Sequence, residues 1–138
     1  HIGMATALDS GLIVPVIRDA DRKNLLALSR EAKDLAVRAR SGGLGPDEIQ
    51  GATFTVTNLG GYGSVDLFNP IINLPEAAIL GVGRVKDTAV PVGGEIQIRP
   101  LMGLSFTYDH RIIDGAVAAE FIRTLISLLE HPARAVLM

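Results

Sequence analysis

The chain has 138 residues, and 48% of them are hydrophobic, which suits a single globular domain with a core of aliphatic side chains. Its 13 basic and 15 acidic residues are interspersed and give a net charge of -2, a balance that offers no basic patch for nucleic acid. The absence of cysteine excludes disulfides, thiolate metal sites and a cysteine nucleophile, and no apolar run is long enough to cross a membrane.

The first part of the chain predicts strands followed by a helix. Residues 1–8 read as strand, and the β-branched run at 13–17 completes a hairpin-like stretch about a turn at Gly11. Residues 24–40 are predicted to form a helix, because apolar residues recur there at intervals of three and four. The sequence Ser41-Gly-Gly then ends this helix.

The second part predicts further strands and one closing helix. Residues 53–58 alternate threonine with apolar side chains, a pattern typical of a half-buried strand. The remaining predicted elements are an ordered loop at 64–75, a buried strand at 77–82, a hairpin at 89–101 about a glycine pair, a strand at 104–108 and a helix at 116–130 ended by Pro132. Strands and helices mix without regular βαβ alternation, so the pattern indicates an α/β or α+β fold.

The most informative segment is Asp109-His-Arg-Ile-Ile-Asp-Gly115. An apolar strand delivers His110 to a strand-to-helix corner, which is a rigid place for an imidazole. Because imidazole changes charge near neutral pH, His110 is the candidate general acid and base. The structural alternative for this residue is a capping or core histidine at the end of a strand.

This motif resembles the active-site signature of the dihydrolipoamide acyltransferases, the core subunits of 2-oxo acid dehydrogenase complexes. Residues 11–17, 53–60 and 70–83 resemble the same family in the same order, so the resemblance covers nearly the whole chain. It implies a chloramphenicol-acetyltransferase-like fold of the α/β class, a two-layer sandwich in which helices cover a mixed β-sheet. Because the catalytic domain of that family is longer, residues 1–138 are expected to be its C-terminal portion, with the upstream part of the domain and the lipoyl and subunit-binding domains absent.

In that family the acyl group moves between the dihydrolipoyl thiol and coenzyme A. The attacking thiol must lose its proton, because the thiolate is the nucleophile. Proton transfer from a thiol of pKa about 8.5 to a histidine of pKa about 6.5 costs about 2.7 kcal/mol, whereas transfer to an ordinary aspartate costs about 6 kcal/mol. His110 is therefore favoured over Asp109 as the base, and it would then protonate the departing sulfur.

The resemblance assigns the oxyanion-stabilising hydroxyl to Thr57, at a position where the family carries serine or threonine. One such donor is typically worth about 3 to 4 kcal/mol of transition-state stabilisation. The structural alternative is that Thr57 is a β-forming residue on an alternating strand, like Thr53 and Thr55.

Four further residues are expected to support the corner that holds His110. Asp114 is predicted to brace it from the start of the following helix, where a carboxylate suits the free N–H groups. Arg111 is expected to pair with a carboxylate, Asp109 to have a structural role, and Gly115 to permit close packing at the helix start.

The resemblance also implies partners and a location. The expected assembly is a homotrimer with sites between subunits, His110 of one chain facing Thr57 of its neighbour, and trimers forming a cubic or icosahedral core. Lipoyl domains, dehydrogenase/decarboxylase subunits and dihydrolipoamide dehydrogenase would attach through upstream domains. Coenzyme A is a substrate and the lipoyl group is carried upstream; no metal, nucleic acid or membrane is expected. The implied location is the bacterial cytoplasm, with the mitochondrial matrix as the alternative.

Three other functions stay open at this point. One is a free-standing coenzyme A-dependent O-acetyltransferase, which would share His110 and the fold. A non-catalytic scaffold is another, although relatives of that kind lose the histidine that this chain keeps. Metal-dependent hydrolysis through His110 and Asp114 lacks further ligands at suitable spacing. Within the acyltransferases, an acetyl or branched-chain acyl group is favoured over succinyl.

Overall fold

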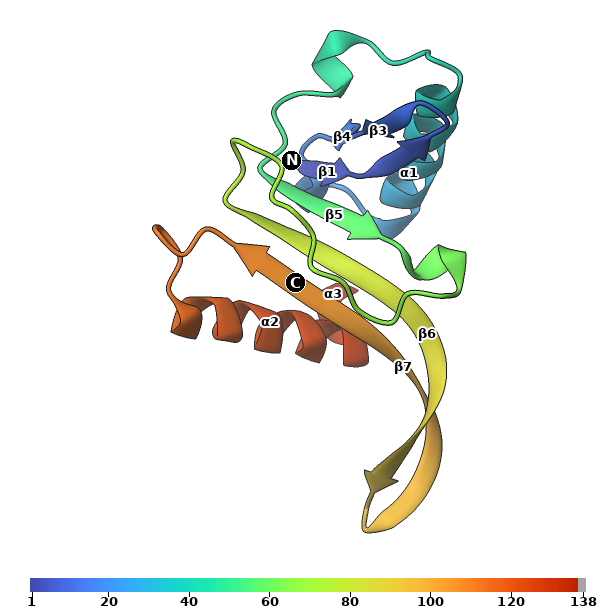
Figure 1. Cartoon of the computed structure of the whole chain (residues 1–138), viewed down its shortest axis with the longest axis vertical. Helices are drawn as coiled ribbons and strands as arrows, with labels where there is room; N and C mark the ends of the chain where they lie inside the picture. The colour runs from blue at the N-terminus through green and yellow to red at the C-terminus, as the bar shows by residue number, and fades with distance from the viewer. Residues whose placement is uncertain (137–138) are drawn as a thin grey trace.

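The computed structural model describes residues 1–136 and contains a five-stranded mixed sheet of order β4-β1-β5-β6-β7 (Figure 1). The three central strands β1, β5 and β6 are parallel, while β4 and β7 pair antiparallel at the two edges. A separate two-stranded hairpin, β2 with β3, precedes β4 in the chain. The predicted mixture of strands and helices is therefore confirmed. The strands are β1 (Ile2–Met4), β2 (Thr6–Leu8), β3 (Gly11–Ile13), β4 (Val16–Ile17), β5 (Phe54–Asn58), β6 (Ala78–Val92) and β7 (Glu95–Tyr108).

One long hairpin replaces the three shorter pieces predicted for residues 77–108. Strands β6 and β7 pair along their whole lengths, with a register shift between Val82 and Val85, and turn at two glycines of positive φ. Counting from this two-residue turn, antiparallel pairs alternate between hydrogen-bonded and non-hydrogen-bonded positions. Pro91 and Pro100 both fall at non-hydrogen-bonded positions, opposite Ile96 and Asp87. The prolines therefore remove no bond between the two strands, and the distal half of the hairpin extends beyond the rest of the sheet (Figure 1).

Helix α1 (Leu25–Arg40) begins at Asn24, whose side chain accepts a hydrogen bond from the Ala27 N–H at 2.9 Å. This is the usual way to satisfy one of the free N–H groups of a helix start. The predicted apolar stripe is buried at its C-terminal end, at Leu35 and Ala39, whereas Leu25 is 77% exposed. The helix packs on β2 and on β4, which is one edge strand of the sheet.

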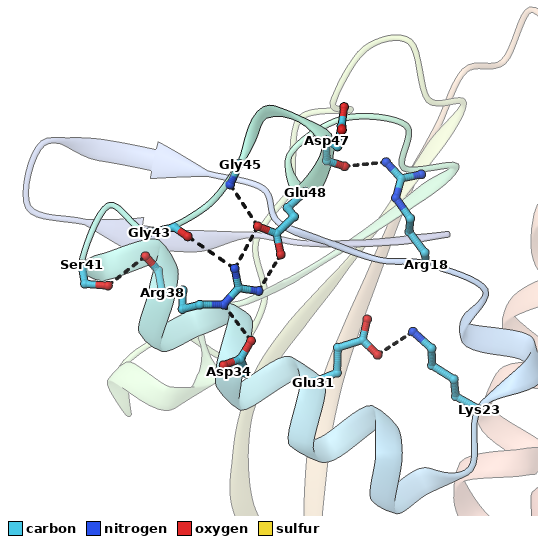
Figure 2. A network of polar contacts seen from close by, with 10 residues as sticks. All are labelled: Arg18, Lys23, Glu31, Asp34, Arg38, Ser41, Gly43, Gly45, Asp47 and Glu48. Carbon is cyan, nitrogen blue, oxygen red and sulfur yellow. Dashed lines mark hydrogen bonds and ion pairs between the residues drawn. The ribbon is translucent and has the colours of Figure 1, made fainter.

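A network of ion pairs connects the end of α1 to the segment that leads into β5 (Figure 2). The Arg38 guanidinium donates to both carboxylate oxygens of Glu48, at 2.5 and 2.8 Å, and to Asp34 at 2.8 Å. Its hydrogen bonds lower the pKa of Glu48 to about 2. Arg18 donates to the carbonyl oxygens of Asp47 and Gln50, at 2.5 and 3.0 Å, so two arginines hold this turn in place.

The loop 64–76 lies on one face of the sheet, where glycines allow it to approach closely. A side chain at Gly83 or Gly103 would collide with the Asp66 carbonyl oxygen, and a Cβ at Gly81 would come within 3.0 Å of the Phe68 ring. The Asp66 carboxylate pairs with Arg84 and also with a lysine of β6 at 2.7 Å. The expected ordered loop is therefore confirmed. Its backbone packs closely on the glycines of the sheet, and the Asp66 side chain forms ion pairs with β6.

Helix α2 (Gly115–Glu130) packs on the opposite face through aromatic side chains. Its Phe121 ring lies 4.9 Å from Phe106 and 5.9 Å from Phe54 between centroids. Phe54 alternates with Thr55 along β5, so these rings lie on the face away from the loop. The helix ends at Glu130 as predicted, and Pro132 then begins a short helix α3 (Pro132–Val136), a position where its missing N–H costs nothing.

Candidate functional site

His110 lies just after β7, at the corner that precedes α2. The backbone of this corner is hydrogen-bonded: the Asp109 N–H donates to the Ala77 carbonyl at 2.8 Å, and the Asp109 carbonyl accepts from the N–H groups of Ile112 and Ile113 at 3.1 and 3.0 Å. The His110 ring lies beside that of Tyr108, with 5.5 Å between centroids, and is exposed. A fixed backbone thus presents an accessible imidazole, which suits proton transfer.

Asp109 forms a two-pronged ion pair with Arg111. The guanidinium donates through Nε at 2.9 Å and through Nη2 at 2.6 Å, and the Arg111 backbone N–H donates at 3.0 Å. These hydrogen bonds lower the pKa of Asp109 to about 2. The carboxylate therefore stays ionised at neutral pH and is occupied by Arg111, an arrangement that orders the corner and does not suit proton transfer.

Two expectations about the start of α2 are wrong in detail. The Asp114 side chain makes no capping hydrogen bond; the residue is exposed, and only its carbonyl accepts, from the Ala118 N–H at 3.0 Å. A Cβ at Gly115 would meet one atom, the Tyr108 hydroxyl oxygen, at an ordinary contact distance of 3.7 Å. Both residues are thus exposed at the helix start within one chain.

Thr57 lies near the C-terminal end of β5 and is half-buried. It lines a cavity of about 380 Å³ together with parts of the β2–β3 hairpin and the 3-10 turn after β5. Arg40, the last residue of α1, is the charged side chain that lines this cavity. The cavity therefore combines a hydroxyl-bearing residue with a cation, a suitable setting for part of an anionic substrate.

The structure does not bring His110 and Thr57 together within one chain. Thr57 pairs with Gly81 of β6, and Gly81 pairs with Ser105 of β7. Thr57 and Ser105 are therefore separated by two strand spacings, about 10 Å. From Ser105 to the end of β7 is a further three residues, about 10 Å, and His110 lies beyond that end. The imidazole is thus beyond the N-terminal end of β5, whereas Thr57 lies near the C-terminal end.

Sequence reasoning missed one buried polar residue near these positions. Glu76 is 7% exposed and accepts hydrogen bonds from the Thr55 hydroxyl at 2.9 Å and from the Asn73 amide at 2.8 Å, both through Oε1. The available signal was an acidic residue directly before the predicted buried strand, where a carboxylate has few ways to reach water.

Some kinds of site do not occur in the part of the chain that the structure describes. Within residues 1–136, histidine, aspartate and glutamate side chains form no group of three or more that could hold a metal ion. None of the helices in that range has the length and apolar character needed to cross a membrane.

Comparison with known proteins gives relatives over almost the whole chain. The family model of the 2-oxoacid dehydrogenases acyltransferase catalytic domain matches residues 1–137. The chain is 47% identical, over 99% of its length, to the dihydrolipoyllysine-residue acetyltransferase component of the acetoin cleaving system of Bacillus subtilis. It is 46% identical, again over 99%, to the succinyltransferase component of the 2-oxoglutarate dehydrogenase complex of Bartonella vinsonii. These matches span 34% and 33% of the two relatives.

Solved structures give the same result for the fold. The cubic core of the pyruvate dehydrogenase multienzyme complex matches with a TM-score of 0.93 and 48% identity, over 99% of this chain and 56% of the other. The dihydrolipoamide acetyltransferase of Azotobacter vinelandii, studied for the roles of a serine, a histidine and an asparagine in its catalytic mechanism, matches with a TM-score of 0.92 and 47% identity, over the same shares. The predicted fold is confirmed, and the chain belongs to the family of 2-oxoacid dehydrogenase acyltransferase catalytic domains.

Proposed function

We propose that this chain supplies the catalytic residues of a dihydrolipoyllysine-residue acyltransferase, which moves an acyl group between a dihydrolipoyl thiol and coenzyme A in a 2-oxo acid dehydrogenase complex. The observation that carries the proposal is His110, an exposed imidazole on a corner fixed by Asp109, in a chain whose residues 1–137 match the model of this family's catalytic domain.

In this mechanism His110 makes two proton transfers, one when the thiol attacks and one when the other sulfur departs. Its neutral imidazole removes the proton of the attacking thiol, and the thiolate adds to the thioester carbonyl to form a tetrahedral intermediate. The Thr57 hydroxyl donates a hydrogen bond to the oxyanion of that intermediate. When the intermediate collapses, the carbon–sulfur bond to the other thiol breaks and the imidazolium returns the proton to the departing sulfur.

A complete site requires two copies of the chain. Within one chain His110 and Thr57 lie too far apart to act on the same carbonyl group, since hydrogen-bond reach is about 3 Å. The similarity to a cubic multienzyme core supports an assembly in which trimers place these residues face to face. Lipoyl domains and the other enzymes of the complex would be the partners of such a core.

Asp114 has a supporting role in this proposal. In the Azotobacter vinelandii relative, the histidine and asparagine studied for the mechanism are four positions apart, as His110 and Asp114 are here. The Asp114 carboxylate makes no capping bond in the chain, so it is free to fix the corner against a neighbouring copy.

The acyl group is the finer part of the proposal. An acetyltransferase and a succinyltransferase match this chain at 47% and 46% identity, so overall identity does not separate the two. We favour an acetyl or branched-chain donor, and a cytoplasmic location is supported by the bacterial origin of both relatives.

The test is acyl transfer to dihydrolipoamide from acetyl-, isobutyryl- and succinyl-coenzyme A, with the assembled full-length protein that contains this chain. The His110→Ala variant should lower kcat by about 10²- to 10⁴-fold, the range for loss of a general base. A folded protein that transfers from none of the donors would refute the proposal. Transfer to a small-molecule hydroxyl instead would indicate an O-acetyltransferase, and no transfer to either acceptor would indicate a scaffold.

A further inference from the structure

Glu76 is a buried carboxylate, and a contribution to stability does not explain why it lies there. Its Oε1 accepts two hydrogen bonds, but its Oε2 is buried and has no partner among the described residues. A buried carboxyl group with one oxygen left without a partner is costly, and an apolar side chain of similar size is often as stable or more so at such a position. Its hydrogen bonds therefore point to a task other than packing.

The first of these bonds reaches the strand that carries Thr57. Thr55 is 1% exposed, and its hydroxyl donates to Glu76 Oε1 at 2.9 Å in a buried setting. Thr55 and Thr57 are two residues apart on β5, so their side chains share one face of the sheet. On the other side of Thr55, a Cβ at Gly3 would come within 2.5 Å of the same hydroxyl oxygen. The Thr55 hydroxyl is thus confined between β1 and Glu76.

The second connection reaches the corner that carries His110. The residue after Glu76 is Ala77, whose carbonyl accepts the Asp109 N–H at 2.8 Å. Asp109 is the immediate neighbour of His110. Residues 76 and 77 are therefore hydrogen-bonded to two places: Glu76 to β5, the strand that carries Thr57, and Ala77 to the corner that carries His110.

We propose that Glu76 is a positioning residue for the acyl transfer, which fixes the strand that carries Thr57 relative to the corner that carries His110. The inference rests on the proposed function. Glu76 does not touch the substrate; it acts through Thr55 on one side and through the Ala77 carbonyl on the other. Because each copy gives its imidazole to one site and its hydroxyl to another, a shift in this spacing misplaces a group in both sites.

The kinetic test compares three changes at this link with one matched control. Glu76→Ala and Thr55→Val both break the link to β5 and should lower kcat at least tenfold with KM within about threefold, since misplacement of about 1 Å can cost 10²-fold in rate. Glu76→Gln keeps an acceptor oxygen and should retain kcat within about threefold. The control, Asn73→Ala, removes the other bond to the same oxygen without touching β5 and should leave kcat within about threefold.

Hydrogen exchange of backbone amides gives a readout that does not depend on activity. In Glu76→Ala and Thr55→Val, exchange at Asp109 and along β5 should accelerate at least tenfold, whereas Asn73→Ala should leave those amides unchanged. If the Glu76→Ala protein does not assemble, the isosteric Thr55→Val and Glu76→Gln variants decide the question.

The two proposals fail in different ways. Altered exchange in a protein that shows no acyl transfer would refute the proposed function and leave the link between strand and corner intact. An active protein in which Glu76→Ala or Thr55→Val has normal kcat and normal exchange, or in which Asn73→Ala is equally damaging, would overturn the role of Glu76.

Discussion

Asp109 and His110 are neighbours in the chain with different surroundings. The Asp109 carboxylate forms a bidentate ion pair with Arg111, and the Asp109 backbone makes the hydrogen bonds that hold the corner. The His110 imidazole is exposed at the surface. Intrinsic acidity alone already favoured histidine over aspartate as the base, and the ion pair widens that difference because it holds the pKa of Asp109 at about 2. Residue identity and the ion pair therefore favour the same assignment, which stays a prediction.

The ion pair predicts a shift when its cation is removed. In an Arg111→Ala variant, the pKa of Asp109 should rise from about 2 toward its ordinary value of 3.8, because the hydrogen bonds that favour the charged form are lost. Since the folded-state pKa is depressed, the pair stabilises the fold above about pH 4 and loses this contribution as the pH falls through about 2. The unfolding midpoints of the two proteins should thus converge in acid.

An NMR titration of the Asp109 side-chain carboxyl carbon measures the shift directly. Arg123→Ala is the matched control, because Arg123 pairs with Glu120 on the exposed side of α2 and does not contact the corner. An Asp109 pKa that stays near 2 without Arg111 would show that another group holds it down.

At the scale of elements, periodicity located every major helix and strand but misjudged the continuity of one hairpin. The predicted pieces stop at residue 82, leave 83–88 unassigned and separate 101 from 104, yet β6 and β7 pair across both gaps with one register shift between Val82 and Val85. Glycine has two uses that sequence alone does not distinguish: it ends an element, or it lets another segment lie directly on it. Gly83 and Gly103 are of the second kind, because the Asp66 carbonyl occupies the space of a side chain at either position.

The close contact between the loop and Gly83 predicts that a methyl group at this position lowers the stability of the fold. Gly83→Ala should lower the free energy of unfolding by about 1–3 kcal/mol, the usual range for overpacking, because backbone must move on both sides of the contact. Chemical denaturation measures it, with Gly61→Ala as the control, since a Cβ at Gly61 meets no atom within 4 Å. Equal stability of the two variants would mean that the loop is not packed as described.

For the whole molecule, the motif around His110 identified the family, and only that resemblance suggested that His110 faces Thr57 of a neighbouring chain; the residue pattern itself did not show where these residues lie relative to one another. Strand order and direction decide that relation, and they place His110 beyond the N-terminal end of β5 and Thr57 near its C-terminal end. The hydrogen bond between Glu76 and Thr55 was equally hidden, because the two residues are 21 positions apart in the sequence. Local sequence determines which groups are present, whereas topology determines which of them meet.

The arrangement predicts complementation between two inactive copies. When His110→Ala and Thr57→Val chains are co-expressed with different affinity tags, mixed trimers that carry both tags should recover about a third of the wild-type activity, because a ring of two copies of one variant and one of the other joins an intact imidazole to an intact hydroxyl at one site in three. Oligomers of either variant alone should be nearly inactive. Mixed oligomers that are no more active than the parents would place the whole site within one copy.

The two prolines of the long hairpin bear on how such a protein stays in solution. A strand edge with a full row of free N–H groups is a template for another strand, and it invites fibrous growth when many copies are held close together. Pro91 and Pro100 fall where their nitrogens face away from the partner strand, so each exposed edge of the projecting arm lacks a donor partway along. A strand arriving from another molecule would find the ladder interrupted on either side, which disfavours aggregation through the projecting arm.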